Sequence, residues 1–535
     1  MVIWSKLQLK KLLVLLVLIL VACEKEEIVT IEPIEPTVYL NHTDYDMADT
    51  SSALKEMGTC YEIFPISFAD SDGDGYGDIN GIIDKLDYLD NLGIECIWIT
   101  PLTASPSYHK YDVVDYYTVD PIFGTNEDYY RLLDETDKLG IKVLMDFVIN
   151  HTSSQHQWFI DSMDPESEYR EYYRWSNLAD KKNYPSYDGW HREGDLYYYG
   201  SFWDQMPDLN LDNATVREEM INIAKFWVEK GIDGFRLDAA KHFFDVDEYP
   251  MGTSTLTQSI RFLKEFNYEM KLLNEDIIIL AEVWSDASIV AKYYQGTDTS
   301  FNFELAEDII NTINNGNDIG MVDNLINTVN EISAVREDYV DSIFLTNHDQ
   351  NRVISRLGED TQKARLAANM LFTLPGVSWI YYGEEVGMNG ATRHEDIRQP
   401  MIWSDDYLTE GHIDGIGNLN TYNKSLESAD IQLNNPESMY NFYRNLIELK
   451  TDDVLKYGDI QSVEKDNNKL IVFTRTYQDK HYLVIHSVSM IDQTVNIDYS
   501  NLIYSYNAWE EENVIKPYGT VVLEVDSLNI EIGQS

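Results

Sequence analysis

Eight short apolar segments, separated by segments of helical length, limit what the middle of this sequence can fold into. The first helical segment, residues 79–92, repeats its apolar residues at helical spacing and ends before Gly93. The strand candidates are residues 60–67, 94–100, 141–149, 235–238, 277–283, 300–303, 342–346 and 377–382. Strands that alternate with helices predict a parallel sheet, and eight of them predict an α/β fold closed into a (β/α)8 TIM barrel rather than an open sheet.

Two regions go beyond a minimal barrel. Residues 151–210 show no sustained period and are dense in aromatic residues, which predicts an inserted subdomain after strand 3, leaning over the barrel mouth. Its rings could stack on sugars or build a small core of their own. Alternation at residues 470–477, 481–487, 494–499 and 520–525 predicts a C-terminal antiparallel β domain. We assign the barrel to residues 51–150 and 211–452, the insert to 151–210 and the C-terminal domain to 453–535.

The charge of the chain restricts its partners. It carries 92 acidic and 40 basic residues, a formal net charge of -52. Nucleic acid and an anionic membrane surface would both be repelled by such a protein, so we expect neither as a partner. A neutral ligand such as a sugar is compatible with this charge.

The first residues predict export. Three lysines precede an apolar run at residues 12–22, which is too short to span a bilayer comfortably but has the length of a secretory signal. The run ends in Leu-Val-Ala-Cys23, which resembles the lipobox of bacterial lipoproteins. We therefore predict a signal peptide at residues 1–22 and lipidation of Cys23, with residues 23–50 as a tether that anchors the protein to the bacterial membrane or cell surface. Export by an ordinary signal without a lipid is the alternative.

Two further cysteines, Cys60 and Cys96, lie in apolar segments that resemble strands. Free cysteine is among the most buried residue types. We predict that both are buried reduced thiols rather than a disulfide.

Acidic residues stand at the carboxyl ends of several predicted strands, where α/β barrels keep their chemistry. The segment 234–242 ends its strand in Asp238, and Arg236 lies two residues earlier, so both side chains should point the same way and the guanidinium can hold the carboxylate ionised. Asp146, Glu282 and Asp349 occupy equivalent places on other strands. Glycoside hydrolysis needs one carboxylate at the anomeric carbon and another carboxyl group to protonate the leaving oxygen, and this mouth can supply both.

Five motifs in these positions resemble the alpha-amylase family, glycoside hydrolase family 13, and appear in the family's order. They are Asp-Phe-Val-Ile-Asn-His at 146–151, Met-Pro-Asp-Leu-Asn at 206–210, the segment 234–242, Glu-Val-Trp at 282–284 and His-Asp at 348–349. The resemblance implies a retaining mechanism in which Asp238 is the nucleophile, Glu282 the general acid and base, and Asp349 the acid that grips the sugar hydroxyls and stabilises the transition state. It further implies substrate-binding roles for the residues that surround them, namely Tyr111, His151, Arg236, Lys241, His242 and His348.

Calcium is the cofactor that we expect, at two places. Asn150, Asp208 and the carbonyl of His242 match the family's calcium site between barrel and insert. The segment 70–78 places Asp70, Asp72, Asp74, Tyr76 (through its carbonyl) and Asp78 at alternate positions with glycines between them, a pattern that suits a hard cation and resembles the calcium loop of oligosaccharide-cleaving relatives. A solvated acidic loop is the alternative for this segment.

The expected activity is cleavage of internal α-1,4 bonds in starch or maltooligosaccharides. Lys241-His242 and Ala239 resemble α-1,4-specific amylases, whereas residues 206–210 resemble a group between oligo-1,6-glucosidases and neopullulanases. An α-glucosidase, a cyclomaltodextrinase or neopullulanase, or a transglycosylase is therefore the alternative. A glucan-binding lipoprotein without catalysis would lack one of the three acids, and all three are present. We expect a monomer whose partner is an α-glucan.

Overall fold

The computed structural model describes residues 44–177, 188–245, 255–405, 423, 425–509 and 513–527. The predicted signal peptide and Cys23 lie outside the described residues. Within them, none of the helices combines the length and the apolar character needed to cross a bilayer.

Eight parallel strands form the central sheet, in the order β11-β10-β9-β5-β2-β1-β13-β12. A parallel bridge between Phe301 and Ser342 joins the two edges, and Asn302 N donates to the Ser342 carbonyl at 2.9 Å. The predicted (β/α)8 barrel is therefore confirmed. Its strands are β1 (Thr59–Ile63), β2 (Cys96–Ile99), β5 (Lys142–Phe147), β9 (Gly234–Leu237), β10 (Ile278–Ala281), β11 (Thr299–Ser300), β12 (Ser342–Phe344) and β13 (Val377–Tyr381).

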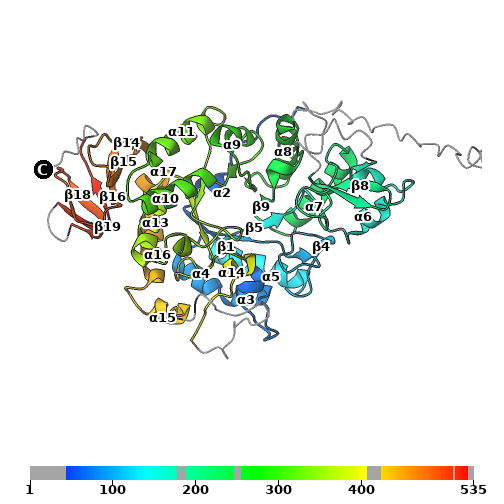
Figure 1. Cartoon of the computed structure of the whole chain (residues 1–535), viewed down its shortest axis with the longest axis horizontal. Coiled ribbons are helices and arrows are strands. Elements are labelled where there is room, and N and C mark those ends of the chain that lie inside the picture. Colours follow the sequence, from blue (N-terminus) through cyan, green and yellow to red (C-terminus); the bar gives the residue numbers. More distant parts are fainter. Residues whose placement is uncertain are drawn as a thin grey trace, which may run out of the picture.

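Helices surround this barrel (Figure 1). Several begin at the side-chain caps that such termini require; α5, for example, has a capping box formed by Thr125 and Asp128 and ends at Gly140, whose φ of 76° is left-handed. The longer helices are α3 (Ile79–Asp84), α4 (Leu86–Leu92), α5 (Asn126–Leu139), α7 (Ala214–Val228), α8 (Leu256–Lys271), α9 (Ala287–Tyr293), α10 (Phe303–Asn315), α11 (Met321–Ser333), α13 (Thr361–Thr373) and α16 (Met439–Lys450). Shorter ones are α2 (Ser52–Lys55), α12 (Val353–Arg356), α14 (His394–Ile397), α15 (Ala429–Leu433) and α17 (Asp453–Tyr457).

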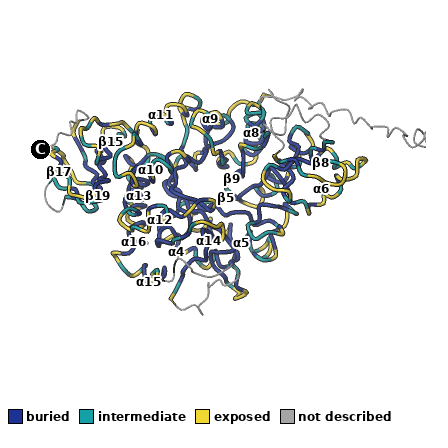
Figure 2. The backbone as a smooth tube through the Cα atoms, in the orientation of Figure 1, coloured by how far each residue is buried: buried dark blue, intermediate teal, exposed yellow. Residues whose placement is uncertain are grey.

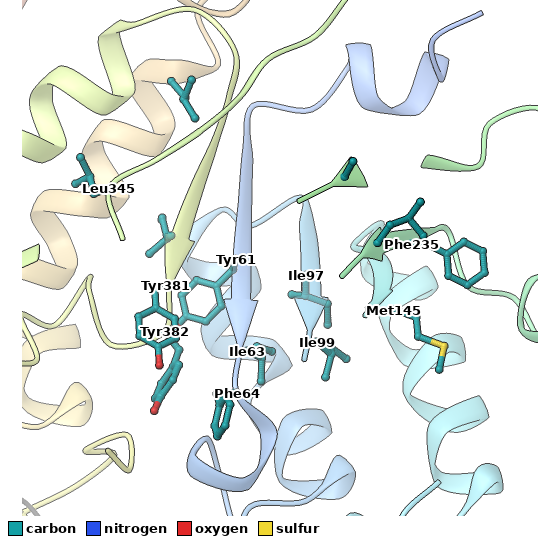
Figure 3. Close-up of a cluster of buried hydrophobic side chains, with 14 of the residues drawn as sticks. Tyr61, Ile63, Phe64, Ile97, Ile99, Met145, Phe235, Leu345, Tyr381 and Tyr382 are labelled. Carbon is teal, nitrogen blue, oxygen red and sulfur yellow. The ribbon is translucent and has the colours of Figure 1, made fainter. Parts of the chain in front are cut away.

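Both faces of the barrel strands are buried, which accounts for their nearly continuous apolar sequences. On one face, side chains such as Tyr61, Ile63, Ile97 and Ile99 belong to the large cluster that also includes residues of the surrounding helices (Figure 3). The alternate side chains, such as Leu144 and Leu280, belong to a second, smaller cluster made largely by the barrel strands. Figure 2 shows this buried centre under a more exposed periphery.

The prediction that Cys60 and Cys96 are reduced thiols is wrong, because the two form a disulfide. They are direct partners in the register of the parallel strands β1 and β2, and their Cα atoms lie 4.6 Å apart. The sequence shows two apolar strands but not that they are neighbours in this register, and burial alone does not separate a thiol from a disulfide.

The insert contains more regular structure than its sequence indicates. It holds α6 (Gln157–Ser162) and a three-stranded antiparallel sheet of β6 (Trp175–Ser176), β8 (Leu196–Tyr199) and β7 (Trp190–Glu193). Several rings pack on one another; Phe159 stacks on Trp175 with centroids 5.6 Å apart. Trp203 is an exception, since it is 49% exposed. The insert's strands are too short to produce a readable alternation.

The C-terminal region forms the predicted antiparallel β structure, at the opposite end of the molecule from the insert (Figure 1). Its strands are β14 (Asp459–Ser462), β15 (Leu470–Tyr477), β16 (Lys480–Ser487), β17 (Gln493–Thr494), β18 (Asn501–Ala508) and β19 (Val514–Glu524). Only the first residue of the expected strand 494–499 is in a strand, whereas β18 was not anticipated. Most of β18 is exposed or half-buried, so it lacks the alternation that a strand with one buried face would show.

Candidate active site

The strand period of two brings polar side chains to the mouth of the barrel. Beyond the apolar interior residues Cys96 and Leu144, the next side chains on the same face of their strands are Trp98 and Asp146. Trp98 Nε1 donates to Asp146 Oδ2 at 3.0 Å. The same alternation places Arg236 on β9, with its guanidinium 4.8 Å from the centre of the Trp98 ring.

Arg236 connects three carboxylates. Its Nη1 lies 3.0 Å from Asp146 Oδ1 and 2.6 Å from Asp238 Oδ1, and its Nη2 lies 2.9 Å from Glu282 Oε2. The Arg236 side chain is 1% exposed. The structure thus brings together two of the predicted catalytic acids, Asp238 and Glu282, on one buried cation.

Electrostatics in this group favour retention of a proton. Burial is the largest influence on Asp238 and raises its pKa, opposed by Arg236 and reinforced by the negative charges of Glu282 and Asp146. Three carboxylates share a single guanidinium, so full ionisation would leave two uncompensated negative charges. Burial raises the pKa of Asp146 as well, so the cluster as a whole tends to bind a proton.

The residue after Asp238 has an unusual backbone. Ala239 has φ 48°, in the left-handed region that non-glycine residues rarely adopt, and its amide donates to Glu282 Oε2 at 2.9 Å. This turn therefore ties the end of β9 to the end of β10. Strained residues of this kind are common at functional sites.

Asp349, the third predicted acid, is held by two cations. Arg398 Nη2 lies 2.7 Å from its Oδ1 and His348 Nε2 lies 3.1 Å from its Oδ2. Burial would raise the pKa of Asp349, but the charges of His348 and Arg398 outweigh it and hold the pKa well below its usual range. Asp349 is therefore ionised at every pH at which the protein would work.

His348 is charged in turn. Its Nδ1 lies 2.5 Å from Glu62 Oε1 on β1. Burial lowers the pKa of His348, but Asp349 and Glu62 outweigh burial and raise it to about 10. The Tyr111 hydroxyl lies 2.9 Å from His348 Nε2, and the two rings are parallel within 10°.

A cavity of about 460 Å³ opens over these groups. His151 lies in its wall with Nε2 buried and without a hydrogen-bond partner, and burial lowers the pKa of His151 to about 3, so the ring is neutral. A neutral imidazole nitrogen without a partner can bond a sugar hydroxyl that enters the cavity. The lining residues are Tyr108, His109, Tyr111, His151, Phe202, Trp203, Met206, Asp238, Ala239, Glu282, Asp349, His394, Glu395 and Arg398.

Four predicted substrate-binding residues are not in this wall. Arg236 and His348 are buried and contact the acids that line it. The other two are Lys241 and His242. Lys241 Nζ donates to the Trp284 carbonyl at 3.1 Å, and Lys241 lines a neighbouring cavity instead. The His242 ring lies 5.1 Å from Phe202, and its Nδ1 lies 2.6 Å from Asp245 Oδ2. Both residues lie beside the catalytic pocket rather than in it.

The predicted calcium ligands fall into two groups. Asp70, Asp72 and Asp78 place ligand oxygens within 4.8 Å of one another, and Asp74 is not part of this group. Asp70 accepts the amides of Gly73 and Gly75 at 2.7 and 2.8 Å, so the loop folds around its carboxylate. Carboxylates keep further lone pairs after accepting such bonds, and the group fits a hard cation.

The second group lies between barrel and insert. A backbone bridge pairs His151 with Asp208, and Leu209 N donates to the Asn150 carbonyl at 2.8 Å. Asp208 Oδ2 is buried without a hydrogen-bond partner, and burial raises the pKa of Asp208 to about 7. An orphaned buried carboxylate oxygen is a place that a cation would satisfy, so these residues also fit calcium.

Several site residues escaped sequence reasoning. Glu62 is a charged residue inside an apolar strand, and such a buried charge is a signal that could have identified it. Trp98 carried no such signal. Arg398 and Phe202 come from irregular segments, and nothing in their local sequence indicates that they reach the mouth.

Comparison with known proteins agrees with this geometry. The family profile described as "Alpha amylase, catalytic domain" matches residues 62–458. The chain is 40% identical to "Alpha-amylase 3" of Dictyoglomus thermophilum, covering 87% of this chain and 92% of that protein. It is 31% identical to an "Oligo-1,6-glucosidase" of Heyndrickxia coagulans, covering 86% and 97%. Among solved structures, the alpha-amylase from H. orenii has a TM-score of 0.78 and 37% identity, covering 88% of this chain and 99% of that one. The chain therefore belongs to the alpha-amylase family of retaining glycoside hydrolases.

Proposed function

We propose that the protein hydrolyses internal α-1,4-glucosidic bonds of starch and maltooligosaccharides. The observation that carries the proposal is the bridge of Asp238 and Glu282 by Arg236, at 2.6 and 2.9 Å. The 2.6 Å contact with the guanidinium favours the carboxylate form of Asp238, which is the form that a nucleophile needs. A retaining double displacement pairs such a carboxylate with a second carboxyl group that gives and takes a proton, the role proposed for Glu282.

In the first step, an oxygen of Asp238 attacks the anomeric carbon, the bond from that carbon to the glycosidic oxygen breaks, and Glu282 gives its proton to the leaving oxygen. Water then attacks the anomeric carbon of the glycosyl ester, Glu282 accepts a proton from it, and Asp238 is released. Asp349 and neutral His151 bind sugar hydroxyls, and the Tyr111 ring supports the sugar. The α-1,4 preference rests on similarity to "Alpha-amylase 3" and on Lys241 and Ala239.

Digestion of soluble starch, maltotriose, pullulan and cyclodextrins with the purified protein tests this proposal. We expect a rapid fall in iodine staining of starch and maltooligosaccharide products that NMR shows first as the α-anomer. Glucose alone from maltooligosaccharides would identify an α-glucosidase, preferred cleavage of cyclodextrins or pullulan a cyclomaltodextrinase or neopullulanase, and longer products a transglycosylase. Absence of cleavage with retained binding would identify a glucan-binding protein.

We propose that calcium binds at two sites. Asp70, Asp72 and Asp78 form one site, and Asn150 and Asp208 contribute to the other. When bound, it would neutralise the carboxylates and fix the loop and the insert. Neither group contains one of the three catalytic acids, so the role is structural. Equilibrium dialysis of the chelated protein against calcium tests the stoichiometry, and a value of zero would contradict the proposal.

We also propose that the protein is exported and anchored by a lipid on Cys23. The support is the basic and apolar signal that ends at this cysteine. Cells that express the full chain with a labelled fatty acid should yield labelled protein in the membrane fraction, and Cys23→Ser should carry no label. An unlabelled wild type would contradict the proposal.

A further inference from the structure

The outward side of helix α8 is a stripe of basic and apolar side chains. Its residues Arg261, Lys264, Tyr268 and Leu272 recur three or four positions apart and therefore lie along one side of the helix. The helix buries its opposite side, which includes Phe266. Figure 1 shows α8 on the outside of the barrel, where it packs against α7 and α9. We call this stripe the α8 face.

The apolar end of the α8 face is open to solvent. Leu272 is 64% exposed, and Tyr268 and the adjoining Leu273 are exposed as well. Single exposed apolar residues are normal on a protein surface, whereas a group of them marks a surface with a partner. The apolar end of α8 therefore indicates a contact with something other than water.

The first described residues pass over the same end of the helix. The Tyr45 ring lies 4.8 Å from the Tyr268 ring, and Ser51 Oγ donates to the carbonyl of Asp276, shortly after α8, at 2.7 Å. Met47 lies between these two contacts along the chain and is also exposed. The segment that leads from the predicted lipid anchor to the barrel therefore arrives at the α8 face.

The other end of the α8 face is basic. A cavity of about 380 Å³ beside it has Arg261, Lys264, Lys292 and Asp44 in its lining. Asp44 Oδ1 lies 3.9 Å from Arg261 Nε, whereas Lys264 and Lys292 form no ion pair within the part of the chain that the structure describes. Ammonium groups next to exposed tyrosine and leucine side chains are typical of helices that lie in the interface of a phospholipid bilayer.

The length of the tether decides how close this face comes to a membrane. Cys23 precedes Asp44 by 21 residues. A chain of that length reaches about 70 Å at full extension. A lipid on Cys23 would keep the barrel at a high effective concentration near the bilayer, where even a weak contact is populated. Because the tether arrives at the α8 face, this side of the barrel is held closest to the membrane.

We propose that the α8 face is a membrane contact, which lays the anchored protein on a zwitterionic phospholipid surface. The inference rests on the proposed lipid anchor and adds to it a second point of attachment that orients the barrel. Tyr268 and Leu272 would enter the headgroup region, and Lys264 and Lys292 would bond lipid phosphates. The net charge of -52 opposes a strongly anionic bilayer, so headgroups without net charge are the surface that fits.

Hydroxyl-radical footprinting tests this contact, because mass spectrometry reads the oxidation of each exposed side chain. The mature chain from Cys23, which keeps every described residue, is compared free in solution and coupled through Cys23 to a maleimide lipid in phosphatidylcholine and phosphatidylethanolamine vesicles. Oxidation of Met47, Tyr268 and Leu272 should fall about threefold or more on the vesicles. Met490 in the C-terminal region, which is 79% exposed, should keep its rate.

A charge in the apolar end should abolish the protection. Leu272→Asp should return the oxidation of Met47 on vesicles to its rate in solution. Leu502→Asp, at an exposed leucine of β18, is the matched control and should keep the protection. Melting temperatures of both variants confirm folding.

Equal oxidation of Met47 and Tyr268 with and without vesicles would overturn the inference. Protection that appears in concentrated solution without vesicles would assign the α8 face to a second copy of the chain, and would overturn it as well. Fatty-acid labelling of Cys23 decides the anchor separately. If the natural chain carries no label, the anchor proposal fails, while the chemically coupled chain still reports whether the α8 face meets the bilayer.

Discussion

Two groups of acids in the described part of the chain, those of the barrel mouth and those of the loop at residues 70–78, are stabilised in opposite ways. At the mouth, Asp146, Asp238 and Glu282 share the Arg236 side chain, which is 1% exposed. In the loop, Asp70 and Asp78 accept amides of the loop's own backbone. A side-chain cation leaves the carboxyl groups free to exchange protons and to attack a substrate, whereas a backbone cradle fixes them in place. What distinguishes a reactive cluster from a structural one is therefore whether a side-chain cation or the backbone amides bind the carboxylates, and not the number of acids.

The largest difference in activity is expected when one aspartate in each group is replaced by asparagine. Asp238→Asn should lower kcat on starch by at least about 10³-fold, because the amide is a poor nucleophile. Asp70→Asn should leave kcat at 25 °C within about twofold, and should lower stability by about 1–3 kcal/mol through the lost charge-assisted bonds. Steady-state kinetics and denaturant unfolding measure the two effects. Equal losses of activity in Asp238→Asn and Asp70→Asn would show that the two groups do not differ in function.

Removal of the Arg236 guanidinium should lower the free energy of unfolding more than the loss of any single hydrogen bond at the barrel mouth. Arg236→Met leaves buried carboxylates without a counter-charge and should destabilise the protein by about 3–5 kcal/mol. Arg236→Lys keeps the charge but cannot reach three acids at once, so it should recover part of that loss. Urea unfolding gives both values. A loss below about 1 kcal/mol for Arg236→Met would show that the acids of the mouth are neutral without it.

Alkaline pH should distinguish the groups through His348. Its folded-state pKa is raised to about 10, so its ionic contribution is complete below its ordinary pKa of about 6.5 and is lost as the pH rises towards 10. The wild type should therefore lose up to a few kcal/mol of unfolding free energy between pH 7 and 10 that His348→Gln does not lose. Melting curves across this range measure the difference. If the stability of the two proteins fell in parallel with pH, His348 would not be the group that carries the positive charge.

The smallest effect concerns calcium at the loop. Saturation at about a hundred times the dissociation constant should add about 2.7 kcal/mol for a site that only the folded protein offers. Asp72→Asn should reduce this gain, because Asp72 belongs to the Asp70 and Asp78 group and is exposed enough to be replaced without repacking. Thermal unfolding with calcium and with a chelator provides the measurement. An unchanged response in Asp72→Asn would assign the calcium effect to Asn150 and Asp208.

The alternation of strands and helices was sufficient to predict the barrel, and the motif order was sufficient to predict that Asp238 and Glu282 meet. The Cys60–Cys96 disulfide and the contact of Arg398 with Asp349 were not predictable, because both depend on which distant segments become neighbours. The sheet of the insert escaped for another reason. Its strands are so short that their burial is decided by the packing of aromatic rings and not by a local period.

The closure of the barrel has a consequence for local stability. Strand β11 contains only two residues, and its contact with β12 depends on the Phe301–Ser342 bridge and on a bond of 2.9 Å between the Thr299 and Ser342 hydroxyls. Glu282 follows β10 on one side of this seam, and Asp349 follows β12 on the other. Segments with few cross-strand bonds open first in hydrogen exchange. Glu282 and Asp349 thus stand on either side of the junction with the fewest bonds between strands. Local opening of this junction would change the distance between the two residues and would therefore lower catalysis before the rest of the barrel unfolds.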